Sequence, residues 1–231
     1  MNIEVHSDDR TVADAAATMI ANMARAAMAA RERFIMAVSG GRTPWLMLGT
    51  LADAQLRWEK IHIAQVDERV ASATDPQRNL VHLRESLLDR MLLPPENMHA
   101  MPVEAADLEH AAGQYAQTLR GVAGQPPVLD LVHLGLGADG HTASLVPGDP
   151  VLAITDADVA VTAPYQGRRR MTLTFPIINR SRQVLWVVTG REKAEALARL
   201  RDGDPAIPAS QVRKDRALVL ADRAAAAELE S

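Results

Sequence analysis

The chain has 231 residues, of which 48% are hydrophobic and only 3% aromatic, with a formal net charge of −4 and no cysteine. The absence of cysteine excludes a disulfide framework, a thiolate nucleophile and cysteine-ligated zinc. The charge and the few aromatic rings argue against nucleic acid as a partner, because phosphates require a basic face and bases require stacking platforms. The one dense basic run, Arg168–Arg170, is too short for that purpose.

The start of the chain and its hydropathy pattern give no indication of export or membrane insertion. Glu4, Asp8 and Asp9 stand where a signal peptide would have a basic segment, and no apolar run approaches about 18 residues. No linker rich in Pro, Gly or Ser divides the chain, so we expect a single domain over residues 1–231. We expect it to be cytoplasmic, with no membrane partner.

The first half of the chain alternates short apolar runs with helical patterns. Phe34–Val38 is too short for a helix and ends at the sequence SGG, which is typical of a buried parallel strand. Thr43 and Pro44 then form a helix start signal. The other elements expected here are an edge strand over Ile3–His6, a helix from the Ser7–Asp9 cap region to about Arg33, a strand over Ile61–Val66, and helices over about Gln77–Leu92 and Asp107–Arg120.

The second half repeats this alternation. The expected strands are Leu129–Leu134, Val159–Ala163, Met171–Phe175, Val184–Thr189 and Ala217–Leu220, with a helix beginning beyond Gly190 and an Ala-rich helix at the end of the chain. Buried strands that alternate with helices predict an α/β fold with a single doubly wound, mainly parallel sheet flanked by helices. Ligand sites of such sheets lie at the carboxyl ends of the strands.

One stretch, Leu129–Gly148, combines a strand, a glycine-rich bend and an ionisable side chain in the sequence LDLVHLGLGADGHTASLVPG. His141 follows the bend, and a histidine is suited to accept a proton at neutral pH. Asp139, two residues earlier, is placed to orient the ring, so the two form the predicted catalytic pair. The alternative interpretation is a loop histidine held only by hydrogen bonds. His133 lies inside the strand and is interpreted as structural.

Three further loops carry polar residues just after expected strands, and Arg170 stands just before another strand. The SGGRTP sequence, residues 39–44, precedes a helix, where glycines and free N–H groups favour an anion such as phosphate. An ordinary strand-to-helix turn is the alternative. Asp67 and Arg69 follow a second strand, Lys193 lies at a helix start beyond a third, and Arg170 directly precedes a fourth. No residues have the spacing of a zinc or calcium site, and no GxSxG sequence marks a nucleophilic serine.

In this order, SGGRTP, VDERV, LGLGADGHTASLVPG, RMTLT and TGREKAEAL resemble the 6-phosphogluconolactonase family over nearly the whole chain. The resemblance implies the fold of sugar-phosphate isomerases and deaminases, and hydrolysis of 6-phospho-D-glucono-1,5-lactone to 6-phospho-D-gluconate in the oxidative pentose phosphate pathway. It implies no metal and no cofactor. It also implies that His141 is the general base that activates water. The implied substrate and phosphate contacts are Ser39, Gly40, Gly41, Arg42, Thr43, Arg69, Arg170 and Lys193, to which the position of Asp67 adds a candidate.

The sequence departs from the family pattern at three places. Arg42 stands where the family often has Ser, Val146 where it usually has Phe, and Gln77–Asn79 where a Ser-Asn pair is common. A glucosamine-6-phosphate deaminase is the alternative enzyme, but it would have an acidic residue in place of Val146. A sugar-phosphate sensor without catalysis is a third interpretation, although the chain has no spare basic module for DNA. Monomer and homodimer stay open.

Overall fold

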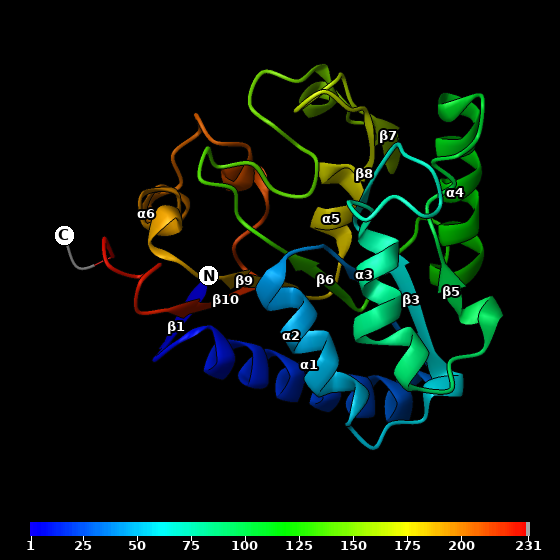
Figure 1. Ribbon diagram of the computed structural model, residues 1–231, viewed down its shortest axis with the longest axis horizontal. Coiled ribbons are helices and arrows are strands. Elements are labelled where there is room, and N and C mark those ends of the chain that lie inside the picture. Colours follow the sequence, from blue (N-terminus) through cyan, green and yellow to red (C-terminus); the bar gives the residue numbers. More distant parts are fainter. Residues whose placement is uncertain (230–231) are drawn as a thin grey trace.

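Seven parallel strands form the centre of the computed structural model, which describes residues 1–229 (Figure 1). Their order across the sheet is β1-β10-β9-β6-β2-β3-β5, with every neighbouring pair parallel. This confirms the predicted doubly wound, mainly parallel sheet. The strands are β1 (Asn2–His6), β2 (Phe34–Val38), β3 (Ile61–Gln65), β5 (Met98–His99), β6 (Leu131–Leu134), β9 (Val184–Val188) and β10 (Ala217–Asp222).

Helices cover both faces of this sheet. One face carries α1 (Asp9–Arg31), α2 (Arg42–Ala52) and α3 (Asn79–Ser86), and the other carries α4 (Leu108–Ala123), α5 (Phe175–Arg180) and α6 (Ala194–Asp202). Along β2, Met36 packs with α1 and α2 while Ile35 and Ala37 pack in the cluster that contains α4. Because both faces are covered, the strand is apolar at every position, and this explains why short continuous runs predicted it.

Short 3₁₀ turns connect several of these elements. They cover Trp58–Lys60, Leu88–Arg90, Pro95–Asn97, Pro150–Ala153, Arg191–Lys193 and Pro208–Gln211. No helix within residues 1–229 is long and apolar enough to cross a membrane. Over the same residues, no group of three or more His, Cys, Asp or Glu side chains could hold a metal ion.

A second, antiparallel sheet contains β4 (Asp67–Arg69), β7 (Val159–Val161) and β8 (Arg170–Leu173), in the order β4-β8-β7. The sequence predicted β7 and β8 as strands but assigned them to the single parallel sheet, which is wrong. The loop between them is too short for the crossover that a parallel pair requires. β8 also ends before the predicted Phe175, because Thr174 and the following Phe-Pro sequence begin α5.

Two predicted helices differ from the structure. The helix expected over Gln77–Leu92 is shorter in the structure, where α3 ends at Ser86 and a separate 3₁₀ turn follows it. The Glu68 carboxylate accepts the N–H groups of Asn79 and Leu80 and so sets the start of α3. The Ala-rich terminal helix is wrong for residues 223–229, which form turns. There the Asp222 carboxylate accepts the Ala225 N–H at 2.7 Å and turns the chain. The last two residues of that prediction lie outside the described range.

The chain changes direction across the sheet between β2 and β6. From β2 the order runs to β3 and β5, and from β6 it runs to β9 and β10 on the other side. The residues paired between the two strands are Met36 with Leu131 and Ala37 with Val132, all before the carboxyl ends. The loops that follow therefore leave in opposite directions and open a crevice, which is where doubly wound sheets bind ligands.

Candidate active site

A cleft of about 560 Å³ opens at this crevice. Its walls come from the loops after β2, β6 and β9 and from the small antiparallel sheet. It is lined by His141 and by every one of the predicted substrate contacts, namely Ser39, Gly40, Gly41, Arg42, Thr43, Asp67, Arg69, Arg170 and Lys193. Residues that lie far apart in the sequence, from 39 to 193, therefore meet at one edge of the sheet.

His141 and Asp139 form a close pair at this cleft. His141 Nδ1 lies 2.6 Å from Asp139 Oδ1, and the His141 backbone N–H donates to the same oxygen at 3.2 Å. Burial alone would raise the pKa of Asp139, but the hydrogen bonds from His141 and Tyr165 hold that pKa below its usual value. Asp139 is therefore an ionised acceptor, so Nδ1 carries a proton and Nε2 is the nitrogen free to take one.

The glycines of this loop are required by close packing. A Cβ atom on Gly137 would overlap the His141 ring. Gly140 has φ of 80°, and a Cβ there would overlap the side chain of Ile207. Any larger residue would displace the His141 ring or the loop, so the glycine-rich sequence and the His141–Asp139 geometry depend on each other.

The Asp67 carboxylate connects two of the cleft loops. It is 5% exposed, and its oxygens accept the hydroxyl groups of Ser39 at 3.2 Å and Ser144 at 2.7 Å. Ser39 begins the loop after β2, whereas Ser144 lies in the loop after β6. Asp67 lines the cleft as predicted, and it also holds together the loops on both sides of the crevice.

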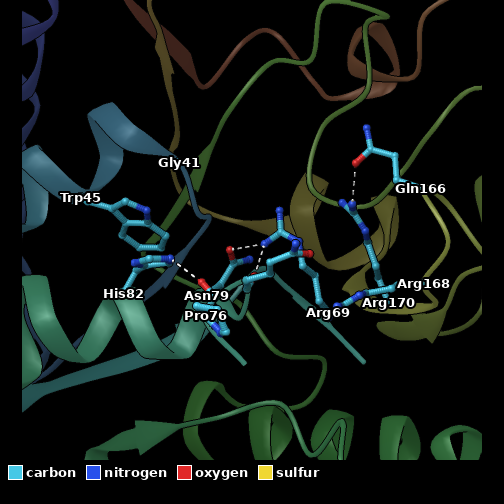
Figure 2. Close-up of a pocket in the computed structure, with 10 residues that line it drawn as sticks. Gly41, Trp45, Arg69, Pro76, Asn79, His82, Gln166, Arg168 and Arg170 are labelled. Atoms are coloured by element: carbon cyan, nitrogen blue, oxygen red, sulfur yellow. Dashed lines mark hydrogen bonds between the residues drawn. The ribbon is translucent and has the colours of Figure 1, made fainter. Parts of the chain in front are cut away.

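The charged run from residue 67 to 69 divides between cleft and core. Arg69 Nη1 donates to Asn79 Oδ1 at 2.9 Å and to the Gln77 carbonyl at 2.8 Å, as Figure 2 shows for the Asn79 contact. Glu68 is fully buried and caps α3. The alternation follows from the strand geometry of β4, in which successive side chains point to opposite faces.

A smaller cavity of about 330 Å³ adjoins the cleft and shares Gly41, Arg69, Asn79 and Arg170 with it (Figure 2). Arg170 reaches across from β8, where its Nη2 donates to Gln166 Oε1 at 3.3 Å. The guanidinium groups of Arg69 and Arg170 therefore border both the cleft and the smaller cavity, which suits an anionic ligand.

The sequence model of the glucosamine-6-phosphate isomerases/6-phosphogluconolactonase family matches residues 7–220. The chain belongs to this family. It is 42% identical over 178 residues to a 6-phosphogluconolactonase of Synechocystis sp., covering 75% of this chain and 74% of that protein. The solved 6-phosphogluconolactonase of Thermotoga maritima is 28% identical with a TM-score of 0.86 and covers 96% of this chain and 98% of its own.

A monomeric glucosamine-6-phosphate deaminase of the NagB superfamily has the same fold, with a TM-score of 0.87 and 20% identity over 99% of this chain and 100% of its own. At that identity the likeness concerns the fold alone. At the position where the deaminase alternative requires an acidic residue, this member of the lactonase family has Val146, which is 5% exposed. The solved lactonase and the solved deaminase thus both confirm the fold expected from the resemblance.

The basic residues of this family member differ in how they are held. Lys193 lies at the entrance to α6, next to Gly190, and lines the cleft. Arg42 also lines the cleft, but its side chain is 84% exposed and its Nη2 lies 3.0 Å from Asp9 Oδ2 on α1. The Arg42 guanidinium is therefore directed toward the surface of α1.

Sequence reasoning missed three residues that build the site, namely Asn79, Ser144 and Tyr165. Asn79 and Ser144 hold Arg69 and Asp67, and they lie in segments that the family resemblance had already marked. His133, interpreted as structural, is fully buried, and its Nδ1 accepts the Ser39 N–H at 3.2 Å at the base of the glycine loop. Tyr165 contacts the predicted catalytic pair, and no local pattern distinguished it.

Proposed function

We propose that this enzyme hydrolyses 6-phospho-D-glucono-1,5-lactone to 6-phospho-D-gluconate with water that His141 activates. Family membership and the named relatives support lactone hydrolysis in the pentose phosphate pathway. The observation that carries the role of His141 is its pairing with Asp139 at 2.6 Å, on a cleft at the carboxyl edge of the sheet. The cytoplasmic location and the organisation of residues 1–231 as one domain stay predictions.

The chemistry requires one base and no covalent nucleophile, because a lactone is an activated ester. Nε2 of His141 takes a proton from water as the oxygen adds to the carbonyl carbon. The tetrahedral intermediate then expels the ring oxygen, which leaves as a hydroxyl group with the proton returned by His141, and the product is the open-chain acid. Asp139 stabilises the positive charge on the ring between these steps.

We assign substrate binding to the backbone of residues 39–43 and to the side chains of Arg69, Arg170 and Lys193. Residues 39–41 precede α2 and Arg42 and Thr43 begin it, where backbone N–H groups and the helix dipole favour a phosphate. Gly41 at the start of α2 has φ of 134°, a conformation that glycine adopts without strain. Arg69, Arg170 and Lys193 add positive charge. An anchored phosphate fixes the carbonyl relative to His141, which favours the reaction by positioning.

A direct test follows the opening of purified lactone above its spontaneous rate, with formation of 6-phospho-D-gluconate as the readout. The wild-type protein is expected to accelerate this step and to release no ammonia from glucosamine 6-phosphate. A wild-type rate equal to spontaneous hydrolysis would sink the lactonase assignment. Ammonia release would instead support the deaminase alternative.

A further inference from the structure

The tip of the β7–β8 hairpin lies over the catalytic pair. Tyr165 and Arg168 exchange two backbone hydrogen bonds, at 2.9 Å and 3.3 Å, across Gln166 and Gly167. Those two central residues have φ of 51° and 80°. Two successive positive φ values give a tight two-residue hairpin turn, whose twist matches that of its strands. The position of Tyr165 is therefore set by the hairpin backbone.

Tyr165 contacts the side chains of Asp139, His141 and Arg170 at once. Its hydroxyl donates to Asp139 Oδ2 at 3.2 Å, on the carboxylate oxygen that His141 does not use. Its ring meets the His141 ring edge-on, with centroids 5.8 Å apart and an interplanar angle of 62°. The Arg170 guanidinium carbon lies 5.0 Å from the Tyr165 centroid, which is a cation–π distance.

The hairpin tip is also fixed on its far side. Arg168 Nη1 donates to Asp75 Oδ2 at 2.6 Å, in the loop before α3. Gln166 accepts from Arg170, so the turn and the guanidinium support each other (Figure 2). Arg170 is 6% exposed, and within the described residues its Nε has no partner. Its orientation therefore depends on Tyr165 and Gln166.

We propose that Tyr165 is a positioning residue for lactone hydrolysis, which holds Asp139, the His141 ring and the Arg170 guanidinium in one arrangement. The inference rests on the proposed role of His141 as the base. The charged and titratable groups that face Tyr165 are Asp139, His141 and Arg170. By donating to Oδ2, the hydroxyl withdraws charge from Asp139, and the carboxylate then stabilises a protonated His141 less strongly.

Two substitutions separate the hydroxyl from the ring. Tyr165→Phe removes only the donor, so Asp139 interacts more strongly with a protonated His141. The acidic limb of the kcat/KM profile is expected to move upward by roughly 0.3 to 1 pH unit, with kcat reduced roughly 2- to 10-fold. Tyr165→Leu also removes the face on which Arg170 lies, and KM is expected to rise a further 2- to 5-fold or so.

The chain has two tyrosines, and the other one provides a matched control. Tyr115 is buried on α4, where its hydroxyl accepts the Gln65 N–H at 3.0 Å. Tyr115→Phe is expected to lower Tm and to leave the acidic limb in place. Tyr165→Phe is expected to give the opposite result, because it should change Tm little and move the acidic limb of the kcat/KM profile to higher pH.

A His141→Gln variant, assayed beside these, tells the two proposals apart. If the wild-type profile has an acidic limb that His141→Gln abolishes, while Tyr165→Phe overlays the wild type, the role of Tyr165 is wrong and that of His141 stands. If Tyr165→Phe changes only Tm, its role is structural and the inference is also overturned. If the wild type shows no limb, or if His141→Gln keeps full activity, the base assignment itself fails.

Discussion

Two histidines eight positions apart occupy contrasting regions, one inside β6 and one in the loop that leaves it. His133 has no exposed surface and faces the Ser39 N–H, and burial lowers its pKa to about 4. His141 keeps 26% of its side chain exposed at the cleft and faces a carboxylate. The neutral ring of His133 serves as a backbone acceptor, whereas His141 faces the cleft, where we propose that it acts as the base. The surroundings of each histidine, and not its residue type, therefore set whether it has a structural or a catalytic role in our proposal.

The same contrast applies to the basic residues. Lys193 and Arg42 both line the cleft, but Arg42 is exposed and paired with Asp9 on α1. Exposed ion pairs contribute little to stability, and their charge is well screened. We therefore expect substitution of a group that faces the cleft to change kcat or KM. Substitution of a buried group of the same residue type should change the free energy of unfolding, and substitution of an exposed one should change neither by a measurable amount.

The largest effect is expected from His141→Ala. Loss of the general base should reduce kcat by roughly 10² to 10⁴, while Tm stays close to that of the wild type because the side chain is not in the core. Steady-state hydrolysis of the phosphorylated lactone and a thermal melt measure both quantities. A loss in kcat of less than fivefold would contradict the role given to His141 and remove the contrast with His133.

Lys193→Ala is expected to come next. If the ammonium group binds the substrate phosphate, a charge-assisted hydrogen bond of about 1.5 to 3 kcal/mol is lost, and kcat/KM falls roughly 10- to 150-fold. Unphosphorylated gluconolactone, assayed as the control substrate, should show almost no change. Equal losses on both substrates would place Lys193 at the reacting carbonyl or in the fold.

His133 is expected to make the folded state sensitive to acid. Histidine in an unfolded chain takes up a proton near pH 6.5, whereas the buried ring does so only near its lowered pKa of about 4. As pH falls between these values, the unfolded state binds the proton first, and the free energy of unfolding decreases, by at most about 2 kcal/mol between pH 6.5 and 5.

Urea unfolding of the wild type and of His133→Gln at pH 7 and pH 5 checks this difference. The wild type should lose more stability on acidification than the variant does. The pKa of His99 is likewise lowered to about 4 by burial, but His99 is present in both proteins and cancels from the comparison. Identical losses would mean that His133 does not titrate as its burial implies.

The smallest effect is expected from Arg42→Ala. Because its guanidinium is directed to Asp9 and away from the cleft centre, kcat/KM for the phosphorylated lactone should change less than about twofold, and stability by less than about 1 kcal/mol. A tenfold loss would show that Arg42 turns into the cleft when substrate binds. Arg42 and Lys193 would then both contact the substrate, contrary to the difference proposed here.

Much of the fold was predictable because its signals are local. The strand over Phe34–Val38 agrees with the structure at both ends, since an apolar run of that length followed by glycines has few alternatives. The core of the β6 strand and the start of α2 follow from the same reasoning. The partners of β7 and β8 were not predictable, because strand pairing joins distant segments and leaves no mark in either strand alone.

The candidate site divides in the same way. His141, Asp139 and the glycine loop are close together in the sequence, so their proximity in space follows from the sequence alone. The pairing of Asp67 with Ser39 and Ser144 joins residues from three strand ends. Glu68 stands between Asp67 and Arg69 in one charged run, and only tertiary contacts bury it completely.

By itself, the sequence determined the family, the alternation of strands and helices, and the loops that carry polar residues, because these depend on neighbouring residues and on short motifs. Only the tertiary structure decided which of those residues face one cleft, that Tyr165 shares Asp139 with His141, and that the Arg42 side chain is directed to α1. Burial and side-chain pairing are properties of residues distant in the chain, and they set whether a charge or a proton is available for chemistry.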